Sequence, residues 1–426
     1  MVTALLFILL LVFATLTLPI GVALGLATAI IMSQFTNIPL SMITQNVFAG
    51  LDSFALLAIP FFMLSGNLMA LGGIARRIVR LADYSFGKIT GGLAIVNVVA
   101  CMFFAAISGS GPATVSAIGS IMIPEMEKRG YEKSFSTGLT ATAGTIGVII
   151  PPSIPFVIYG VVAGASIGDI FIAGIIPGLM IGLALISVAY FISKKRGYKG
   201  VERKTDETFF EVFKDSFWAL MAPVIILGGI YGGIFTPTEA SVVAIVYSLF
   251  AGIFIYKELT WKIWVDSLKQ TADLNGMTGL AIAFSMAFAQ YLSVEQIPVA
   301  IGAYLSSAIS SDIVMMLLIL VSLLVVGCFV DNISSCLILT PVFLPLVKSM
   351  GIDPIHFGVL MTVALAIGFV TPPYGANLFV ASAVANIRYE TIAKAAIPFL
   401  IAMFICLLLI TFVPEISMFL VYLMRG

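Results

Sequence analysis

Apolar residues form long blocks along this chain, and short polar or glycine- and proline-rich stretches separate the blocks. Most blocks, taken with their flanks, reach the roughly 20 apolar residues that a membrane-crossing helix requires. Clear examples are residues 5–18, 93–106, 170–192 and 313–326. The chain has room for about ten such helices. The pattern therefore predicts an all-α polytopic membrane protein. Its opening segment, near 3–18, is expected to be a retained helix, since no basic leader precedes it.

Composition supports the same class. Hydrophobic residues make up 61% of the chain and charged residues 10%, whereas soluble domains carry roughly 25% charged residues. The net charge of zero indicates no particular partner. The four cysteines lie in apolar surroundings without the spacing of a metal site, so we expect them to be core residues. They are Cys101, Cys328, Cys336 and Cys406.

An internal repeat relates the two halves of the chain. Four prolines of the first half recur 221 positions later: Pro124, Pro151, Pro152 and Pro177 align with Pro345, Pro372, Pro373 and Pro398. Average proline usage predicts roughly 0.4 such coincidences by chance. Gly147 and Gly368 keep the same offset. We therefore expect two repeat units, residues 1–193 and 218–426, joined by a linker at 194–217.

Basic residues predict how the units are oriented, because lysine and arginine gather in cytoplasmic loops. The first half carries Arg76, Arg77, Arg80 and Lys88, while the aligned segment 297–309 has no basic residue. The linker region holds seven of the 21 basic residues. We expect the linker and the basic loop to lie in the cytoplasm and the second unit to be inverted. An odd number of crossings per unit then predicts a periplasmic N-terminus.

Each unit contains two segments that interrupt an ordinary spanning helix. Residues 92–124 and 313–345 are long enough for two half-helices, and their middles, SGSGPATVS and VDNISS, suit a turn better than a lipid-facing helix. Residues 134–165 and 355–386 each contain a Pro-Pro pair. Proline removes a backbone donor and disfavours a helical residue before it. We predict two re-entrant hairpins and two broken helices.

Interrupted helices free backbone groups, which membrane proteins tolerate only inside protein or around a wet cavity. Two hairpin tips and two breaks, related by inversion, are typical of secondary transporters whose site lies near the midplane at the repeat interface. Freed carbonyls suit sodium, and half-helix N-termini favour an anion. The pattern therefore favours a secondary transporter.

Several polar residues have simpler explanations, which the sequence leaves open. Asp331 can be the N-cap of the second hairpin arm, and Tyr374 or Asn377 can satisfy broken backbone. His356 is a lone histidine in a loop-like segment. We expect helix caps or turn residues at three further acidic positions: Asp52, Asp273 and Glu239.

Several runs recur in a fixed order over essentially the whole chain: SFALLAIPFFMLSGNLM, SGSGPATVSAIGSIMIPEMEKRGY, GTIGVIIPPSIPFVIYG with IFIAGIIPGLM, and GIDPIHFGV with IGFVTPPYGANLF. In these runs the sequence resembles the large membrane subunit of tripartite ATP-independent periplasmic (TRAP) transporters. In detail it resembles the sialic-acid branch more than the dicarboxylate branch. The resemblance implies sodium-driven import of an organic acid anion across the bacterial inner membrane by an elevator motion. It also implies two partners, a small four-helix membrane subunit and a periplasmic binding protein.

The resemblance also implies site residues. One sodium ion (Na+) would lie between the first tip and the first break, at Ser108, Ser110, Gly111, Gly147 and Ile150. A second would lie between the second tip and the second break, at Cys328, Asp331, Asn332, Gly368 and Thr371. The anion would lie between the tips, near Ser108, Thr114, Ser153, Ser334 and Asn377. Since Ser110 aligns with Asp331, the two sodium sites need not be equivalent.

Other classes are compatible with parts of the pattern. An intramembrane enzyme would need a catalytic set, and the sequence presents no His–Cys pair, paired aspartates or metal-ligand cluster, so we expect no enzyme activity. A channel would share the broken helices. A stand-alone sodium/dicarboxylate-type symporter, or a channel-like anion carrier without a binding protein, is the alternative function.

Overall fold

The computed structural model describes residues 2–16, 18–200, 207–309 and 311–425. Within these ranges the regular elements are all helical, which confirms the predicted class. Seven helical segments are long and apolar enough to cross a membrane. They are Phe54–Leu71, Ile167–Arg196 (α10), Phe209–Tyr231 (α11), Pro237–Ile255, Trp261–Val294 (α13), Asn332–Ser349 (α16) and Tyr389–Phe412 (α19).

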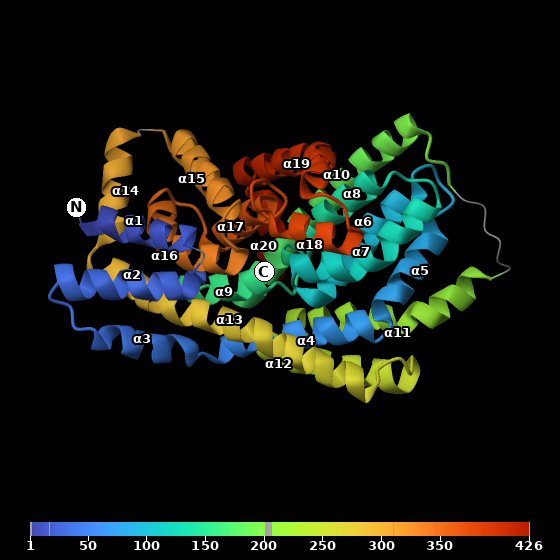
Figure 1. The fold of residues 1–426 in the computed structure, drawn as a ribbon, viewed down its shortest axis with the longest axis horizontal. Helices are drawn as coiled ribbons and strands as arrows, with labels where there is room; N and C mark the ends of the chain where they lie inside the picture. Colours follow the sequence, from blue (N-terminus) through green and yellow to red (C-terminus); the bar gives the residue numbers. More distant parts are fainter. Residues whose placement is uncertain (1, 17, 201–206, 310, 426) are drawn as a thin grey trace.

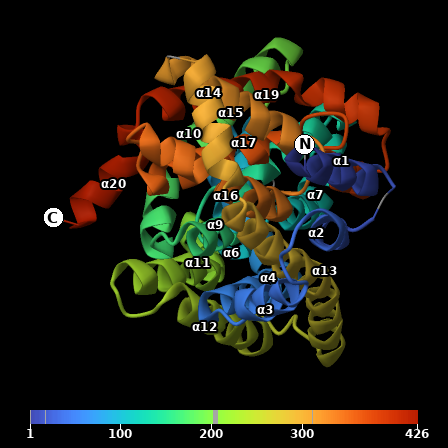
Figure 2. The same cartoon turned by 90° about the vertical axis from the view of Figure 1, so that its left-hand side faces the viewer.

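The helices form two layers (Figures 1 and 2). One layer, which we call the framework, contains α13 and α11 together with α2 (Ile20–Phe35), α3 (Ser41–Leu51), α4 (Ala58–Leu71) and α12 (Pro237–Phe250). Helix α13 packs on α2, α3 and α4, and α12 packs on α4 and α11. Helix α1 (Val2–Thr15) packs on α2. The framework therefore joins helices from both halves of the chain.

The other layer, which we call the hairpin body, contains the interrupted segments. In the first half these are α6 (Gly92–Ser108), α7 (Gly111–Lys128), α8 (Lys133–Ala143) and α9 (Ile154–Ala163), followed by α10. In the second half they are α15 (Asp312–Gly327), α16, α17 (Pro354–Gly368) and α18 (Ala376–Ala385), followed by α19. Helices α5 (Ile74–Phe86) and α14 (Ile297–Ala308) lie between these groups in sequence, and each contacts both layers.

The two halves contact each other reciprocally inside the hairpin body. Helix α7 packs on α18, and its counterpart at the 221-residue offset, α16, packs on α9, the counterpart of α18. In the same way α8 packs on α19 while α17 packs on α10. Each half therefore supplies the contact surface that the other half needs for its own hairpin and broken helix.

The hairpins turn where the sequence changes to small polar residues. Gly109 adopts a left-handed φ of +62° between α6 and α7, a conformation that glycine takes without steric cost. Helix α7 then begins at Gly111 with a proline in its first turn, where the missing N–H costs nothing. Both hairpins extend slightly beyond the expected 92–124 and 313–345, to Lys128 and Ser349, because their prolines lie inside α7 and α16.

The broken helices lie close to the expected 134–165 and 355–386. A 3-10 turn, Gly144–Val148, follows α8, and the Pro151–Pro152 pair separates it from α9. Gly368 ends α17, and the Pro372–Pro373 pair separates it from α18. Both Pro-Pro peptide bonds are cis. The two breaks therefore share one local design.

Some boundaries differ from the sequence-based expectations. Helix α10 continues to Arg196 and α11 begins at Phe209, so both enter the range expected for the linker. A capping box, in which the Thr208 hydroxyl and the Glu211 carboxylate bond each other's backbone N–H, starts α11 early. Residues 201–206 of the linker lie outside the described residues. Two short helices were not predicted: α3, and α20 (Glu415–Arg425), which packs on α10.

Three acidic residues expected as caps have different outcomes. Glu239 is confirmed, since its carboxylate accepts the backbone N–H of Thr236 at 2.8 Å at the start of α12. Asp52 lies in the short break between α3 and α4, and no side-chain cap from it is seen. Asp273 is not a cap, because it lies inside the continuous helix α13. The second half thus has one long helix where the first half has two.

An ion-pair network fixes α5 to the framework. The Arg77 guanidinium lies 2.7 Å from the Glu258 carboxylate and 3.5 Å from that of Asp215. Arg80 bonds Asp215 at 2.7 Å, and the Arg77 guanidinium stacks on the Tyr256 ring at 3.7 Å. Three of the basic residues that predict the cytoplasmic side therefore lie together at one end of the framework, namely Arg76, Arg77 and Arg80.

Candidate functional site

The tip of the first hairpin holds a compact group of oxygen atoms. The Ser108 hydroxyl lies 3.0 Å from the Thr114 hydroxyl, and the Thr114 hydroxyl donates to the Ser110 carbonyl at 2.9 Å. Ser108 and Thr114 are almost completely buried. The first break meets this group at Gly147, where a Cβ atom would lie 2.6 Å from the Ser110 carbonyl oxygen. The structure therefore brings together four of the predicted residues.

A residue of the second half completes the first tip. The Asn377 side chain lies against Gly111, where a Cβ atom would lie 3.2 Å from its Oδ1, and its Nδ2 donates to the Ala141 carbonyl at 3.2 Å. The Oδ1 atom is buried and has no hydrogen-bond partner among the described residues. An unpaired buried acceptor costs about 1–3 kcal/mol. Asn377 therefore bonds backbone beside the first break through its Nδ2, and its Oδ1 has no partner among the described residues.

Ser153 and Ile150 lie in the first break, and their side chains have mainly structural contacts. The Ser153 hydroxyl donates to the Val148 carbonyl at 2.7 Å and accepts the Phe156 N–H at 3.4 Å, which caps α9. Ile150 packs against Gly178 of α10. The backbone beside Ser153 contacts the tip directly, since the Ile154 N–H donates to the Gly109 carbonyl at 3.2 Å.

The second tip meets the second break through backbone. A Cβ atom on Gly368 would lie 2.5 Å from the carbonyl oxygen of Gly327, the last residue of α15. Around this contact, the Cys328 thiol donates to the Leu324 carbonyl at 3.1 Å and the Thr371 hydroxyl to the Ile367 carbonyl at 2.7 Å. Both side chains therefore bond their own helices.

Asp331 is the N-cap of α16, as one of the two interpretations predicted. Its Oδ1 accepts the Ser334 backbone N–H at 3.0 Å, and its side chain is exposed. The residues after it are buried, and the Asn332 Nδ2 and Ser334 Oγ atoms have no hydrogen-bond partner among the described residues. No hydrogen bond of the described residues joins Ser334 to the first tip. The second tip therefore gathers unpaired polar atoms beside an exposed carboxylate.

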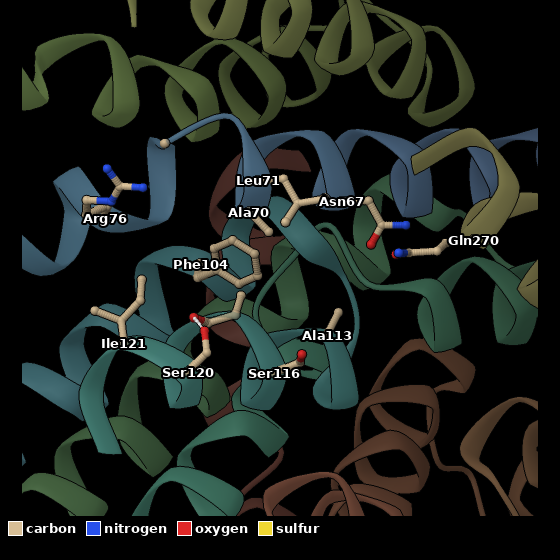
Figure 3. Close-up of a pocket in the computed structure, with 13 residues that line it drawn as sticks. Asn67, Ala70, Leu71, Arg76, Phe104, Ala113, Ser116, Ser120, Ile121 and Gln270 are labelled. Carbon is tan, nitrogen blue, oxygen red and sulfur yellow. Dashed lines mark hydrogen bonds between the residues drawn. The ribbon is translucent and has the colours of Figure 1, made fainter. Parts of the chain in front are cut away.

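A cavity of about 450 Å³ borders the first tip. Its walls come from α4, the start of α5 and α13 on one side and from α6 and α7 on the other (Figure 3). Gly66 of α4 lies between the cavity and Ser108, and a Cβ atom there would approach the Ser108 Cα to 3.1 Å. The sequence analysis missed this cavity. Its one sequence signal is the run of small residues on one face of α7, at Ala113, Ser116, Ala117 and Ser120.

Two of the polar residues singled out earlier lie outside this region of contacts. Buried His356 of α17 lies 2.6 Å, through its Nδ1, from the hydroxyl of Ser417 on α20. This contact explains the histidine as a link between helices. Tyr374 lies in the second break with 49% of its surface exposed, and its ring packs on Phe379.

The fold is that of a polytopic membrane protein. The YdaH transporter of Alcanivorax borkumensis matches it with a TM-score of 0.66 over 96% of this chain and 98% of the other, at 13% sequence identity. The chain itself belongs to the DctM family: residues 7–416 match the family described as tripartite ATP-independent periplasmic transporter, DctM component. It is therefore a TRAP large membrane subunit, as the resemblance implied.

Curated relatives agree with the family and differ in their named substrates. The chain is 47% identical to the isethionate TRAP transporter permease protein DctMQ of Oleidesulfovibrio alaskensis, over 94% of this chain and 63% of that protein, so it spans less than two thirds of that relative. It is 41% identical to the C4-dicarboxylate large permease protein DctM of Pseudomonas aeruginosa, over 93% of each chain. It is 38% identical to the sialic acid large permease protein SiaM of Vibrio cholerae, over 96% of each. All three are named as permeases, and the identities do not single out the sialic-acid branch.

Proposed function

We propose that this chain is the membrane-spanning subunit that carries a small organic acid anion into the cell in symport with sodium. The observation that supports this most directly is the first tip. There, oxygen atoms of Ser108, Ser110 and Thr114 face the first break, and Asn377 arrives from the other half with an unpaired buried oxygen. A site built from both halves suits transport, because its two sides belong to structurally related units.

The chemistry of the tips fits a cation such as sodium. At the first tip, the hydroxyl and carbonyl oxygens of Ser108, Ser110 and Thr114 lie 2.9–3.4 Å from one another. These are the neutral oxygen donors that a hard cation prefers. Gly147 lets the break approach them without a side chain. We assign the first sodium ion to this group with the backbone of Gly111 and Ile150, and the second to Cys328, Asp331, Asn332, Gly368 and Thr371.

The anion is assigned to the region between the tips. Four helices begin at the tips and breaks, namely α7, α9, α16 and α18. Helix N-termini carry unpaired N–H groups and a partial positive charge, so they favour an anion. Ser108, Thr114, Ser153, Ser334 and Asn377 are buried polar residues near these N-termini. The unpaired atoms of Ser334 and Asn377 are the ones that gain most from a ligand.

The two layers suggest how the substrate crosses. The framework meets the first hairpin through small residues, and Gly66 of α4 lies directly on Ser108 of α6. Small residues allow close helix approach without interlocking side chains. We propose that the hairpin body moves as a unit against the framework in an elevator motion. The reciprocal contacts between the halves support the two inverted repeats that such a motion uses.

The substrate class and the partners follow from the relatives. Their names specify isethionate, C4-dicarboxylates, sialic acid and 2,3-diketo-L-gulonate. All four are anions of small organic acids, and isethionate comes from a relative that is 47% identical. We propose the same class here, delivered by a periplasmic binding protein, with a small four-helix membrane subunit as partner in the bacterial inner membrane. The N-terminus is proposed to be periplasmic.

Uptake into liposomes tests the proposal. The chain is reconstituted with its small subunit, the binding protein is added outside, and labelled isethionate, succinate and sialic acid are supplied separately. We expect one of them to accumulate above its outside concentration when a sodium gradient points inward, and not when potassium replaces sodium. Sodium-independent equilibration would indicate a channel instead. Equal uptake without the binding protein would favour the stand-alone symporter.

A further inference from the structure

We propose that the cavity between the framework and α7 is a second anion-binding position, separate from the tips, at which the substrate is held on its way to the cytoplasm. The inference rests on the proposed transport function for the identity of the anion. The inference that the cavity binds anions of any kind depends only on the residues that line it. Its volume of about 450 Å³ lies in the range of 300–1,000 Å³ typical of small-molecule sites.

The hairpin wall of the cavity carries two serine hydroxyls among small and apolar residues. Ser116 and Ser120 are one helical turn apart on the same face of α7, and both are exposed to the cavity (Figure 3). The Ser116 hydroxyl makes no hydrogen bond within the described part of the chain, and the Ser120 hydroxyl donates only to the Ala117 carbonyl, at 3.0 Å. A hydroxyl can rotate to donate to an anion. The alanines between them leave room for it.

The framework wall supplies stronger donors at two ends. Figure 3 shows the amides of Asn67 and Gln270 close together at one end and Arg76 at the other. The Asn67 Nδ2 donates to the Thr271 hydroxyl at 3.2 Å, which orients that amide. A small acid anion with a second polar group, such as a hydroxyalkyl sulfonate or a dicarboxylate, can meet a donor at each end. The cavity therefore fits the proposed substrate class in polarity as well as in size.

The one charge on the cavity wall is positive, and a carboxylate lies beside it. Arg76 is the only formally charged residue among the 13 that line it. Its guanidinium lies 3.3 Å from the Glu258 carboxylate, and the Arg76 side chain is 69% exposed. Glu258 keeps a shorter partner, Arg77, at 2.7 Å. Since an exposed ion pair contributes little to stability, Arg76 can turn toward an anion at small cost.

The position of the cavity gives it a place in the transport path. Gly66 separates it from Ser108 at the first tip, and Arg76 places its outer end beside the basic cluster that predicts the cytoplasmic side. An anion that leaves the tip when the layers slide apart at Gly66 enters this cavity next. The small face of α7 is the surface along which it moves.

A charge-selective labelling experiment tests the anion site. Ser120→Cys is introduced into the full chain, and its reaction rates with an anionic sulfonate-bearing methanethiosulfonate and with a cationic trimethylammonium analogue are compared. Because the four native cysteines are buried, the wild-type chain gives the background. We expect Arg76→Gln to slow the anionic reagent about twofold relative to the cationic one, the size of effect that a unit charge roughly 4–6 Å away produces in water at physiological salt. Arg76→Lys, which keeps the charge, should restore most of the rate.

Ser85→Cys is the matched control. It lies on the same helix as Arg76 but nine residues away, about 13.5 Å along the axis, which exceeds the Debye length of about 8 Å. Its rates should not respond to Arg76→Gln. An anionic rate at Ser120→Cys that does not change in Arg76→Gln overturns the anion site. So does a failure of both Ser116→Cys and Ser120→Cys to react when Ser85→Cys reacts.

An uptake assay then tests whether the transported substrate passes through this site. In the uptake assay, Arg76→Gln should lower the initial rate several-fold, and Arg76→Lys should recover it. If the wild-type chain shows no sodium-dependent uptake, the proposed function fails, while the labelling result still decides whether the cavity attracts anions. Normal uptake in Arg76→Gln, together with the labelling change, would overturn the role of the cavity as a transit position.

Discussion

The two hairpin tips are equivalent in sequence position and different in chemistry. In the first tip, Ser108 and Thr114 are buried, their hydroxyls are 3.0 Å apart, and the Ser110 carbonyl accepts one of them. In the second tip, the position of Ser110 is taken by Asp331, an exposed carboxylate that caps α16. The two tips therefore share a backbone plan and differ in their polar groups, so the two proposed ion sites would bind by different means.

The glycines of the two breaks show the same divergence. Gly147 faces the carbonyl of Ser110 in the turn of the first hairpin. Gly368 instead faces the carbonyl of Gly327 at the end of α15. At these glycines the first break thus meets polar atoms of its tip, and the second meets the backbone of Gly327. Contact between tip and break has been conserved at both places while the atoms in contact have changed.

The largest expected effect comes from filling these contacts. Gly368→Ala should lower the melting temperature and abolish uptake, since its three nearest obstacles are all backbone atoms of Gly327. Gly147→Ala should cost less, because its backbone obstacles, the Ser110 carbonyl oxygen and carbon at 2.6 and 2.9 Å, are farther away than those at Gly368, at 2.3–2.6 Å. Overpacking of this kind costs about 1–3 kcal/mol. Thermal unfolding in detergent, followed by tryptophan fluorescence, measures both.

Gly276→Ala provides the control for this pair. A Cβ atom at Gly276 of α13 meets nothing within 4 Å, and alanine favours a helix over glycine by about 1 kcal/mol. Its melting temperature should be unchanged or higher. If Gly147→Ala and Gly368→Ala behave like Gly276→Ala, the close approach of tips and breaks is not important for folding or transport.

The next effect distinguishes the two proposed ion sites. Asp331→Asn keeps the ability to cap α16 and loses only the charge, so we expect normal folding and a several-fold higher sodium concentration for half-maximal uptake. Ser110→Ala should change that concentration less, because the Ser110 atom that faces Thr114 and Gly147 is its carbonyl oxygen. Uptake measured against sodium concentration compares the two variants. An unchanged curve for Asp331→Asn would leave that residue as a helix cap and nothing more.

Much of the architecture could be predicted because proline, glycine and apolar length act locally. The paired prolines at Pro151 and Pro372 locate both breaks, and the small polar runs locate both tips, within a few residues. Helix α3 was missed because its sequence, SMITQNVFAGL, is too short and too polar for a spanning helix. Asp273 was misjudged because α13 continues through the place where the first half breaks.

The parts of the site that could not be predicted combine residues far apart in sequence. Asn377 of the second break reaches Gly111 of the first tip, a contact that depends on how the halves pack. The cavity brings Arg76 and Gln270 to the same wall from different halves. No local spacing encodes either pairing. They follow from the reciprocal packing of the two units, which the repeat suggests only in outline.

The smallest expected effect tests whether hydroxyl hydrogen bonds in the two tips differ in strength, as their distances indicate. Thr114 and Ser335 align at the 221-residue offset. The Thr114 hydroxyl donates to Ser110 at 2.9 Å, whereas the Ser335 hydroxyl lies 3.5 Å from the Val330 carbonyl, at the limit of a hydrogen bond. A buried hydrogen bond contributes about 0.5–1.5 kcal/mol.

Thr114→Val should therefore lower the free energy of unfolding by about 1 kcal/mol. It should also raise the sodium concentration for half-maximal uptake, since it removes an oxygen from the first tip. Ser335→Ala should leave both within experimental error. Equal losses in the two variants would mean that the tips are alike in their hydrogen bonding, and the proposed difference between the ion sites would then rest on Asp331 alone.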